Sequence, residues 1–228
     1  MSKAKTVAKV QPRKSLTMVA YEQLEELITT LKLEPGTVLS EAALVDQLGI
    51  GRTPIREALQ KLEREGLILI LPRKGIQVTD INPRKQLLLL ELRRELEKLL
   101  ARTGALRATD TERLQFESIA NAMENTIDHE DHVGFMRQDY ALNQLISKAG
   151  HNEYASRAIG LIQGLARRFW FMHRVEAADM TLCTRLHAEL ARSIARGSPD
   201  DAENAVDALL DYLETFTRAT VDPNLLSR

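Results

Sequence analysis

The sequence has 228 residues, of which 44% are hydrophobic, so the chain can bury a sizeable core and a wholly disordered protein is excluded. Its net charge of −1 conceals an asymmetry, because residues 1–80 carry 12 Lys and Arg against 10 Asp and Glu, whereas the remainder carries 19 against 22. No apolar run reaches the ~20 residues of a membrane span, no secretory signal is recognisable, and the single cysteine, Cys183, has no internal disulfide partner. These features favour a cytoplasmic protein in a reducing compartment.

The extreme N-terminus is basic. No acidic residue precedes Glu22, whereas the basic residues there are Lys3, Lys5, Lys9, Arg13 and Lys14. We predict a disordered arm at 1–14. Such an arm either contacts the phosphates or the minor groove of a nucleic acid or only keeps the chain in solution.

Three short helices are predicted next. Apolar side chains recur at helical spacing over residues 16–31. Ser40 is a suitable N-cap for a short second helix. The third helix is expected to begin with Thr53 as its cap and Pro54 at its first position, and Gly66 is expected to end it.

A β-hairpin is predicted after these helices, because two β-rich runs at 67–71 and 76–78 flank a turn at 72–75. Three helices followed by a hairpin, with glycines in the turn between the second and third helices, form a winged helix-turn-helix arrangement. The sequence therefore predicts a winged helix-turn-helix domain at 15–80 and a linker at 81–83.

The remainder of the chain is predicted to be helical, so the protein as a whole is expected to be mainly α. The candidate helices span 84–106, 110–128, 131–149, 153–176, 180–196 and 200–220. Helices joined by short loops favour an all-α helical-bundle domain at 84–222, followed by a tail at 223–228.

The amino end of the third helix carries the predicted base readers. In this arrangement that end enters the major groove, and an arginine there can bind the O6 and N7 atoms of a guanine. Arg52 and Arg56 suit this role, and the hairpin tip can reach phosphate or the minor groove. Taken singly, the same arginines would fit an ordinary solvated surface. The predicted DNA-binding residues are Arg52, Thr53, Pro54, Arg56, Arg73, Lys74 and Gly75.

Residues 16–79 resemble the DNA-binding domain of the GntR family of transcription regulators. The stretches that carry the resemblance are 34–41, 48–59, 62–67 and 74–78. The resemblance implies a homodimer on double-stranded, pseudo-palindromic operator DNA. Gly51 stands where the family usually has Ser or Thr, and Ala42 stands where it often has Arg. These departures imply fewer phosphate contacts or a different operator sequence.

Residues 84–222 resemble the FCD ligand-binding domain of the FadR subfamily. The resemblance implies an internal cavity that commonly holds a divalent metal on one Asp and three His. Asp139 and His187 match two of these ligands, whereas Asn143 and Tyr212 occupy the places of the other histidines. Two alternatives stay open. Either Asp139, Asn143 and His187 bind a divalent ion, zinc or similar, with water completing the site, or the pocket is metal-free and Asp139, His187 and Tyr212 hydrogen-bond the effector or each other.

Arginines suggest the chemistry of the effector. Arg93 matches an arginine that points into the cavity in many relatives, and an arginine fork recognises a carboxylate. The alternative is a surface ion pair between Arg93 and Glu97, four residues on. Among Arg167, Arg168 and His173, helical period does not decide which side chain lines the cavity. The predicted effector-binding residues are Arg93, Asp139, Asn143, His187 and Tyr212.

These features predict a ligand-responsive, sequence-specific DNA-binding regulator, specifically a repressor that a small organic acid releases from DNA. An enzyme is not expected, because the chain has no nucleophile motif and no glycine-rich phosphate loop. The competing functions are a metal-dependent hydrolase using Asp139 and His187, a metal sensor, and a metal-free acyl-CoA binder.

Overall fold

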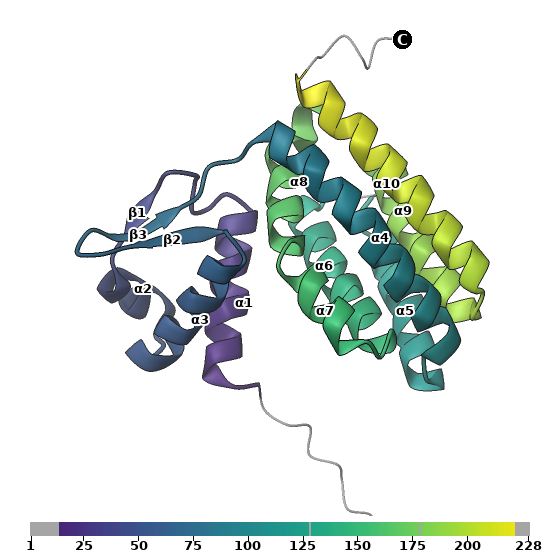
Figure 1. The fold of residues 1–228 in the computed structure, drawn as a ribbon, viewed down its shortest axis with the longest axis horizontal. Coiled ribbons are helices and arrows are strands. Elements are labelled where there is room, and N and C mark those ends of the chain that lie inside the picture. Colours follow the sequence, from purple (N-terminus) through teal and green to yellow (C-terminus); the bar gives the residue numbers. More distant parts are fainter. Residues whose placement is uncertain (1–13, 128, 178, 222–228) are drawn as a thin grey trace, which may run out of the picture.

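The computed structural model describes residues 14–127, 129–177 and 179–221. The predicted arm, apart from Lys14, and the predicted tail at 223–228 lie outside these residues. Two parts stand side by side, a small mixed α/β part and a larger helical part (Figure 1). Within the described residues, no helix is both long and apolar enough to cross a membrane. The predicted class, a mainly α protein with an N-terminal winged helix-turn-helix and an all-α bundle, is confirmed.

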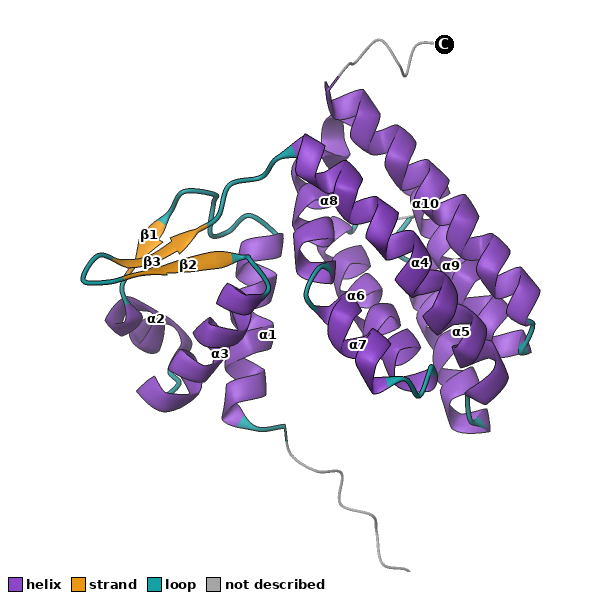
Figure 2. Cartoon of the chain, in the orientation of Figure 1, coloured by secondary structure: helices purple, strands orange, loops and turns teal. Residues whose placement is uncertain are grey.

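The N-terminal part consists of three helices and a small sheet (Figure 2). Its elements are α1 (Leu16–Thr29), β1 (Val38–Leu39), α2 (Glu41–Leu48), α3 (Arg52–Arg64), β2 (Ile68–Leu71) and β3 (Gly75–Val78). The sheet is antiparallel in the order β1-β3-β2, with Val38 opposite Gln77 and Ile68 opposite Val78. The predicted two-stranded hairpin is therefore incomplete. A two-residue strand is too short to show the alternation by which strands are recognised.

Side-chain caps place these helices as the sequence indicates, with one correction. The Ser40 hydroxyl accepts a hydrogen bond from the backbone N–H of Ala43 at 3.1 Å, and Gly66 adopts the left-handed conformation expected after α3. The N-cap of α3 is Gly51 and not Thr53, so Pro54 is the third helical residue. A proline is tolerated there because the first-turn N–H groups have no acceptor within the helix.

The helical part contains seven helices among the described residues. They are α4 (Pro83–Arg107), α5 (Asp110–Glu124), α6 (His132–Ala149), α7 (Glu153–Gly160), α8 (Gln163–Ala177), α9 (Met180–Arg196) and α10 (Pro199–Val221). The single helix predicted over 153–176 is wrong, because Leu161 caps α7 and the chain turns before α8. Glycines at 160 and 164 weaken helix propensity at this break.

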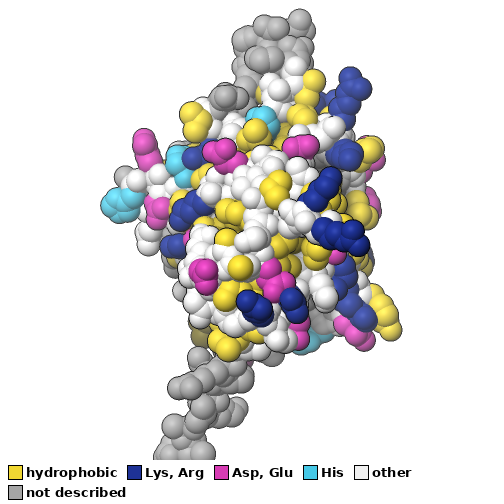
Figure 3. All heavy atoms as spheres, turned by 90° about the vertical axis from the view of Figure 1, so that its left-hand side faces the viewer, with side chains coloured by type: hydrophobic (Ala, Val, Ile, Leu, Met, Phe, Trp, Pro, Cys, Tyr) yellow, Lys and Arg dark blue, Asp and Glu magenta, His cyan; other side chains and the backbone are white. Residues whose placement is uncertain are grey.

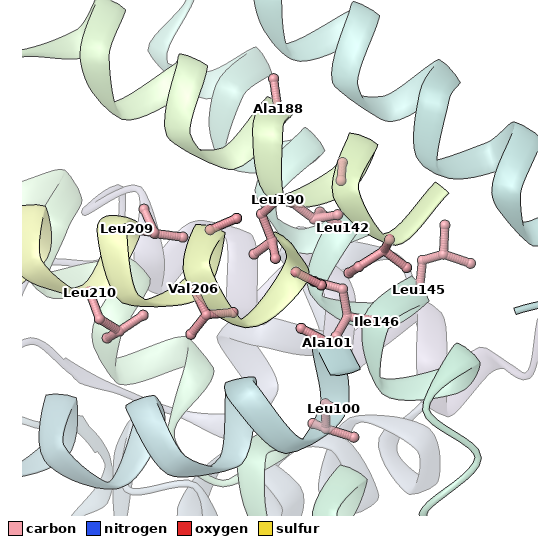
Figure 4. Packing of buried hydrophobic residues seen from close by; sticks show 14 of the residues in the cluster. Leu100, Ala101, Leu142, Leu145, Ile146, Ala188, Leu190, Val206, Leu209 and Leu210 are labelled. Atoms are coloured by element: carbon pink, nitrogen blue, oxygen red, sulfur yellow. The ribbon is translucent and has the colours of Figure 1, made fainter. Parts of the chain in front are cut away.

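Aliphatic side chains from α4, α6, α9 and α10 form a large part of the core of the bundle. Figure 4 shows Leu100 of α4, Ile146 of α6, Leu190 of α9 and Val206 of α10 in this core. All four are at most 6% exposed. This packing leaves α8 on the side of the bundle that faces α1 (Figure 1).

Helix α8 joins the two parts through a buried arginine. Arg168 is 2% exposed, and its guanidinium donates hydrogen bonds to the backbone oxygens of Thr79 (2.8 Å) and Asp80 (3.3 Å) and to the Thr79 hydroxyl (2.9 Å). Burial lowers the pKa of Arg168 to about 10, against the opposing effect of Asp80. The segment that leaves β3 is therefore fixed to the bundle before the linker begins.

A buried carboxyl group also lies near this interface. The Tyr21 hydroxyl donates to Glu65 at 3.0 Å, and the Lys61 ammonium lies 3.9 Å from Glu65. Burial raises the pKa of Glu65 to about 7, although the Tyr21 hydrogen bond and Lys61 act in the opposite direction. Glu65 therefore titrates near neutrality in the folded protein.

This titration predicts a pH-dependent stability. A carboxyl whose pKa is raised on folding stabilises the fold fully below its unfolded pKa, near 4.5, and loses that contribution as the pH rises to about 7. The free energy of unfolding of the wild type should therefore fall relative to Glu65→Gln between pH 5 and pH 7, by about 2 kcal/mol. Urea denaturation of both proteins across this range measures the difference, and a pH-independent difference would contradict the assignment.

Candidate DNA interface and ligand cavity

The amino end of α3 is presented to solvent. Arg52 and Thr53 are exposed and Pro54 is half-buried, whereas Ile55 is fully buried against the domain core. Gly51 at the N-cap has no side chain that could accept from the first-turn N–H groups. These groups and the positive end of the helix dipole are left for an external acceptor, which suits a phosphate.

Arg56 is held in place by a residue that the sequence analysis did not single out. Its Nε donates to the Glu41 carboxylate at 2.7 Å, and this hydrogen bond raises the pKa of Arg56. Glu41 is the first residue of α2, so the bond connects the two helices of the helix-turn-helix. The Nη groups of Arg56 lie outside this bond, and paired donors of this kind can bind the O6 and N7 atoms of a guanine.

The tip of the β2–β3 hairpin carries Arg73 and Lys74, both exposed. Figure 3 looks onto this side of the molecule, where Lys and Arg side chains alternate with Asp and Glu. Gly75 closes the turn at φ 107°, and a Cβ on it would lie 2.5 Å from the backbone oxygen of Leu39. A side chain at 75 would therefore collide with β1, which makes glycine a requirement of the three-stranded sheet.

The geometry at the tip predicts the effect of Gly75→Ala. The added methyl group must displace β1 in a backbone conformation that L residues avoid, so the free energy of unfolding should fall by roughly 2 kcal/mol. Gly160→Ala is the matched control, because a Cβ there meets no atom within 4 Å and no positive φ is involved. Thermal denaturation followed by circular dichroism compares them, and equal stabilities would refute the steric argument.

A small cavity of about 30 Å³ lies inside the bundle. It is lined from α4, α6, α8, α9 and α10, and its wall includes Arg93, Asp139, Asn143, Arg167, Trp170 and His187. This volume holds about two water molecules. The free space is therefore small and lies beside these polar groups.

The polar floor of the cavity centres on Asp139. Its Oδ1 accepts from the Asn143 amide at 3.0 Å and lies 3.4 Å from His187 Nε2, while His187 Nδ1 lies 2.8 Å from the backbone oxygen of Cys183. Both imidazole nitrogens thus face acceptors. Burial acts to lower the pKa of His187, but Cys183 and Asp139 outweigh it and raise the pKa. Burial likewise acts against ionised Asp139, yet His187 holds the pKa of Asp139 below its usual value. The pair is therefore ionised.

These donors do not fit the metal site that the resemblance implies. Among the described residues, no group of three His, Cys, Asp or Glu side chains could hold a metal ion. Tyr212 does not line the cavity, because its hydroxyl donates to the backbone oxygen of Asp179 at 3.2 Å. Asp139, His187 and the Asn143 amide remain, and Asp139 already contacts the other two. The prediction that Tyr212 contacts an effector finds no support.

The arginines around the cavity differ in their partners. Arg93 lines the cavity, as the resemblance implies, and its Nε also donates to Glu97 at 2.7 Å, as the alternative predicts. This ion pair is buried and does not lie at the surface. Arg167 also lines the cavity, whereas Arg168 is bound at the linker and His173 packs on the ring of Phe169.

Arg167 contacts both parts of the protein. Its Nη2 donates to Glu25 of α1, and its Cζ lies 4.9 Å from the ring centre of Tyr140. Arg167 Nη1 is buried and has no hydrogen-bond partner among the described residues. The sequence gives no signal for the Glu25 contact, because the two residues are 142 positions apart.

A winged helix-turn-helix with an exposed reading helix, fixed to a helical domain with a polar internal cavity, defines a transcription regulator that responds to a ligand. Comparison with protein families supports this class. Residues 16–78 match the bacterial regulatory proteins of the gntR family, and residues 88–212 match the FCD domain. The chain belongs to the GntR family of transcription regulators, in the FadR-like group with a C-terminal FCD domain.

Curated relatives and solved structures agree with this assignment. The chain is 23% identical over 209 residues to the HTH-type transcriptional repressor RspR of Escherichia coli K12, covering 92% of each chain. It is 26% identical to the HTH-type transcriptional repressor NanR of Enterobacter sp. 638, covering 91% of this chain and 87% of NanR. The structure of E. coli McbR/YncC has a TM-score of 0.77 at 15% identity, covering 92% of this chain and all of that one, which shows the fold alone.

The family and the names of these relatives describe transcription regulators and not enzymes, in agreement with the sequence analysis. GntR regulators bind DNA through the N-terminal domain, and the FCD domain binds effectors. The protein is therefore a DNA-binding transcriptional regulator with a ligand-binding domain.

Proposed function

We propose that the protein is a repressor that binds a pseudo-palindromic operator as a homodimer and is released by a small organic acid. The observation that carries the proposal is the exposed amino end of α3, where Arg52 and Arg56 stand beside uncapped backbone N–H groups. Two such modules on two half-sites multiply affinity and specificity.

The roles of the DNA-contacting residues follow from their positions. Arg52 is free to enter the major groove, and Arg56 presents a guanidinium oriented by Glu41. Thr53 and Pro54 lie at the same helix end and contact base or backbone. Beyond them, the hairpin tip reaches phosphate or the minor groove through Arg73, Lys74 and Gly75.

The cavity favours an anionic effector. Arg93, Arg167 and ionised His187 supply positive charge. The carboxylates of Glu97, Glu25 and Asp139 balance it in the absence of a ligand. A small organic acid would compete for these cations through charge-assisted hydrogen bonds. Arg93, Asp139, Asn143 and His187 are the residues that we assign to effector binding, and the ionised Asp139–His187 pair stands in place of a metal.

Replacement of both base readers tests operator recognition. Arg52→Ala with Arg56→Ala should reduce affinity for an operator selected from a random DNA library by more than about 100-fold, since each arginine–guanine pair contributes ~1–3 kcal/mol. Arg64→Ala, exposed at the opposite end of α3, is the control and should retain selective binding. Gel-shift titration measures each affinity. Intact operator selectivity in the double variant would disprove the reading-helix assignment.

Metal removal tests the metal-free cavity. Chelator-treated protein should bind operator, and respond to the same acids, as the untreated protein does, because Asp139 and His187 neutralise each other. Metal analysis and gel shifts before and after chelation provide the measurement. A response that disappears with the chelator and returns with added zinc would show that the cavity needs a metal.

A further inference from the structure

We propose that Arg167 receives the carboxylate of the effector and that Glu25 of α1 occupies this position in the closed state, so that effector binding and the contact of α1 with α8 compete for one guanidinium. The inference rests on the proposed effector-responsive function and adds the residue through which the cavity and the DNA-binding domain are connected.

The first support is the position of Arg167. It is a wall residue of the cavity and, at the same time, the cation that pairs with a glutamate of the DNA-binding domain. Burial alone would lower the pKa of Arg167, but Glu25 and Asp139 outweigh it, and the guanidinium remains charged. A carboxylate that enters the cavity therefore meets a cation whose present partner belongs to the other domain.

The second support is a comparison of the three buried arginines. Arg93 is paired with Glu97 on its own helix, so this ion pair does not connect the cavity to the DNA-binding domain. Arg168 donates to backbone oxygens at the exit of β3 and is not a wall residue of the cavity. Arg167 has a side-chain partner on α1 and a buried Nη1 without a hydrogen-bond partner in the described chain. A carboxylate bound to Arg167 would supply the missing acceptor for this donor.

The third support concerns Glu25. It is 4% exposed, and a carboxylate at this depth is tolerated only while a cation compensates it. Once an effector occupies Arg167, Glu25 would remain buried and unpaired unless α1 moved toward water. The cost of that unpaired charge favours separation of α1 from α8, which changes the placement of the reading helix.

The volume of the cavity agrees with competition. About 30 Å³ leaves little free space beside Arg167 for a carboxylic acid. The closed structure and the acid-bound structure are then two states with one arginine exchanged between two carboxylates.

The chain supplies a matched control next to Glu25. Glu26 also binds an arginine of the helical part, because Arg137 donates to both of its carboxylate oxygens at 3.0 and 2.7 Å. This pair is exposed, and Arg137 does not line the cavity. Glu25→Gln and Glu26→Gln therefore each remove one carboxylate of α1 that binds an arginine of the helical part. Only Glu25→Gln removes a competitor of the effector for a residue of the cavity wall.

Trp170 provides the readout. It is the single tryptophan of the chain, it is 5% exposed, and it lines the cavity. The full-length protein is titrated with sodium acetate, with sodium chloride at equal ionic strength as the reference, while tryptophan fluorescence is recorded. The half-saturating acetate concentration should fall about ten-fold or more in Glu25→Gln and stay within about two-fold of the wild type in Glu26→Gln. The fluorescence response to acetate should be lost in Arg167→Gln.

Several results would overturn the proposal: an unchanged or weakened acetate response in Glu25→Gln, an equal shift in Glu26→Gln, a wild-type response in Arg167→Gln, or no response in any variant. Circular dichroism verifies that each variant is folded, and Glu25→Gln tests the proposal even if Arg167→Gln does not fold. The titration contains no DNA. Unchanged operator affinity in acetate, together with a shifted midpoint in Glu25→Gln, would contradict the proposed release mechanism and leave the assignment of Arg167 standing.

Discussion

The buried ion pair between Arg167 of α8 and Glu25 of α1 is the constraint on which the relation between the two domains depends. It is reinforced by the neighbouring Arg168, which binds the end of β3 through backbone oxygens. Arg168 binds backbone oxygens next to the linker, whereas Arg167 binds a side-chain carboxylate that, in our proposal, a ligand replaces. The proposal therefore treats the first contact as the fixed one and the second as the reversible one.

This arrangement explains how a ligand in a cavity about the size of two water molecules would influence the placement of the reading helix α3. An effector shifts the balance between two states only by its difference in affinity for them, and couplings of about 1–3 kcal/mol are typical. Exchange of one buried carboxylate for another on Arg167 supplies a difference of this kind, because Glu25 loses its partner as the ligand gains one. In this proposal the charges of Asp139 and His187 compensate each other without a metal.

Much of the fold could be predicted from the sequence, because caps and periodicity are local signals. Ser40 and Gly66 act as expected. The two-residue β1 forms through tertiary pairing, which the sequence does not show. The break between α7 and α8 occurs at glycines, which weaken a helix without always ending it. For the site, Arg93, Asp139, Asn143 and His187 converge on one cavity, while Tyr212 turns to Asp179. Arg167 could not be assigned, since its partner lies in another domain.

Amide hydrogen exchange of the full-length protein, with and without saturating sodium acetate, tests the central claim most directly. If the acetate carboxylate replaces Glu25 on Arg167, the amides of α1 should exchange faster in acetate, whereas those of α5, which packs on α9 away from α1, should not. Unchanged or slower exchange throughout α1, at acetate concentrations where Trp170 fluorescence shows that the cavity is filled, would contradict the account.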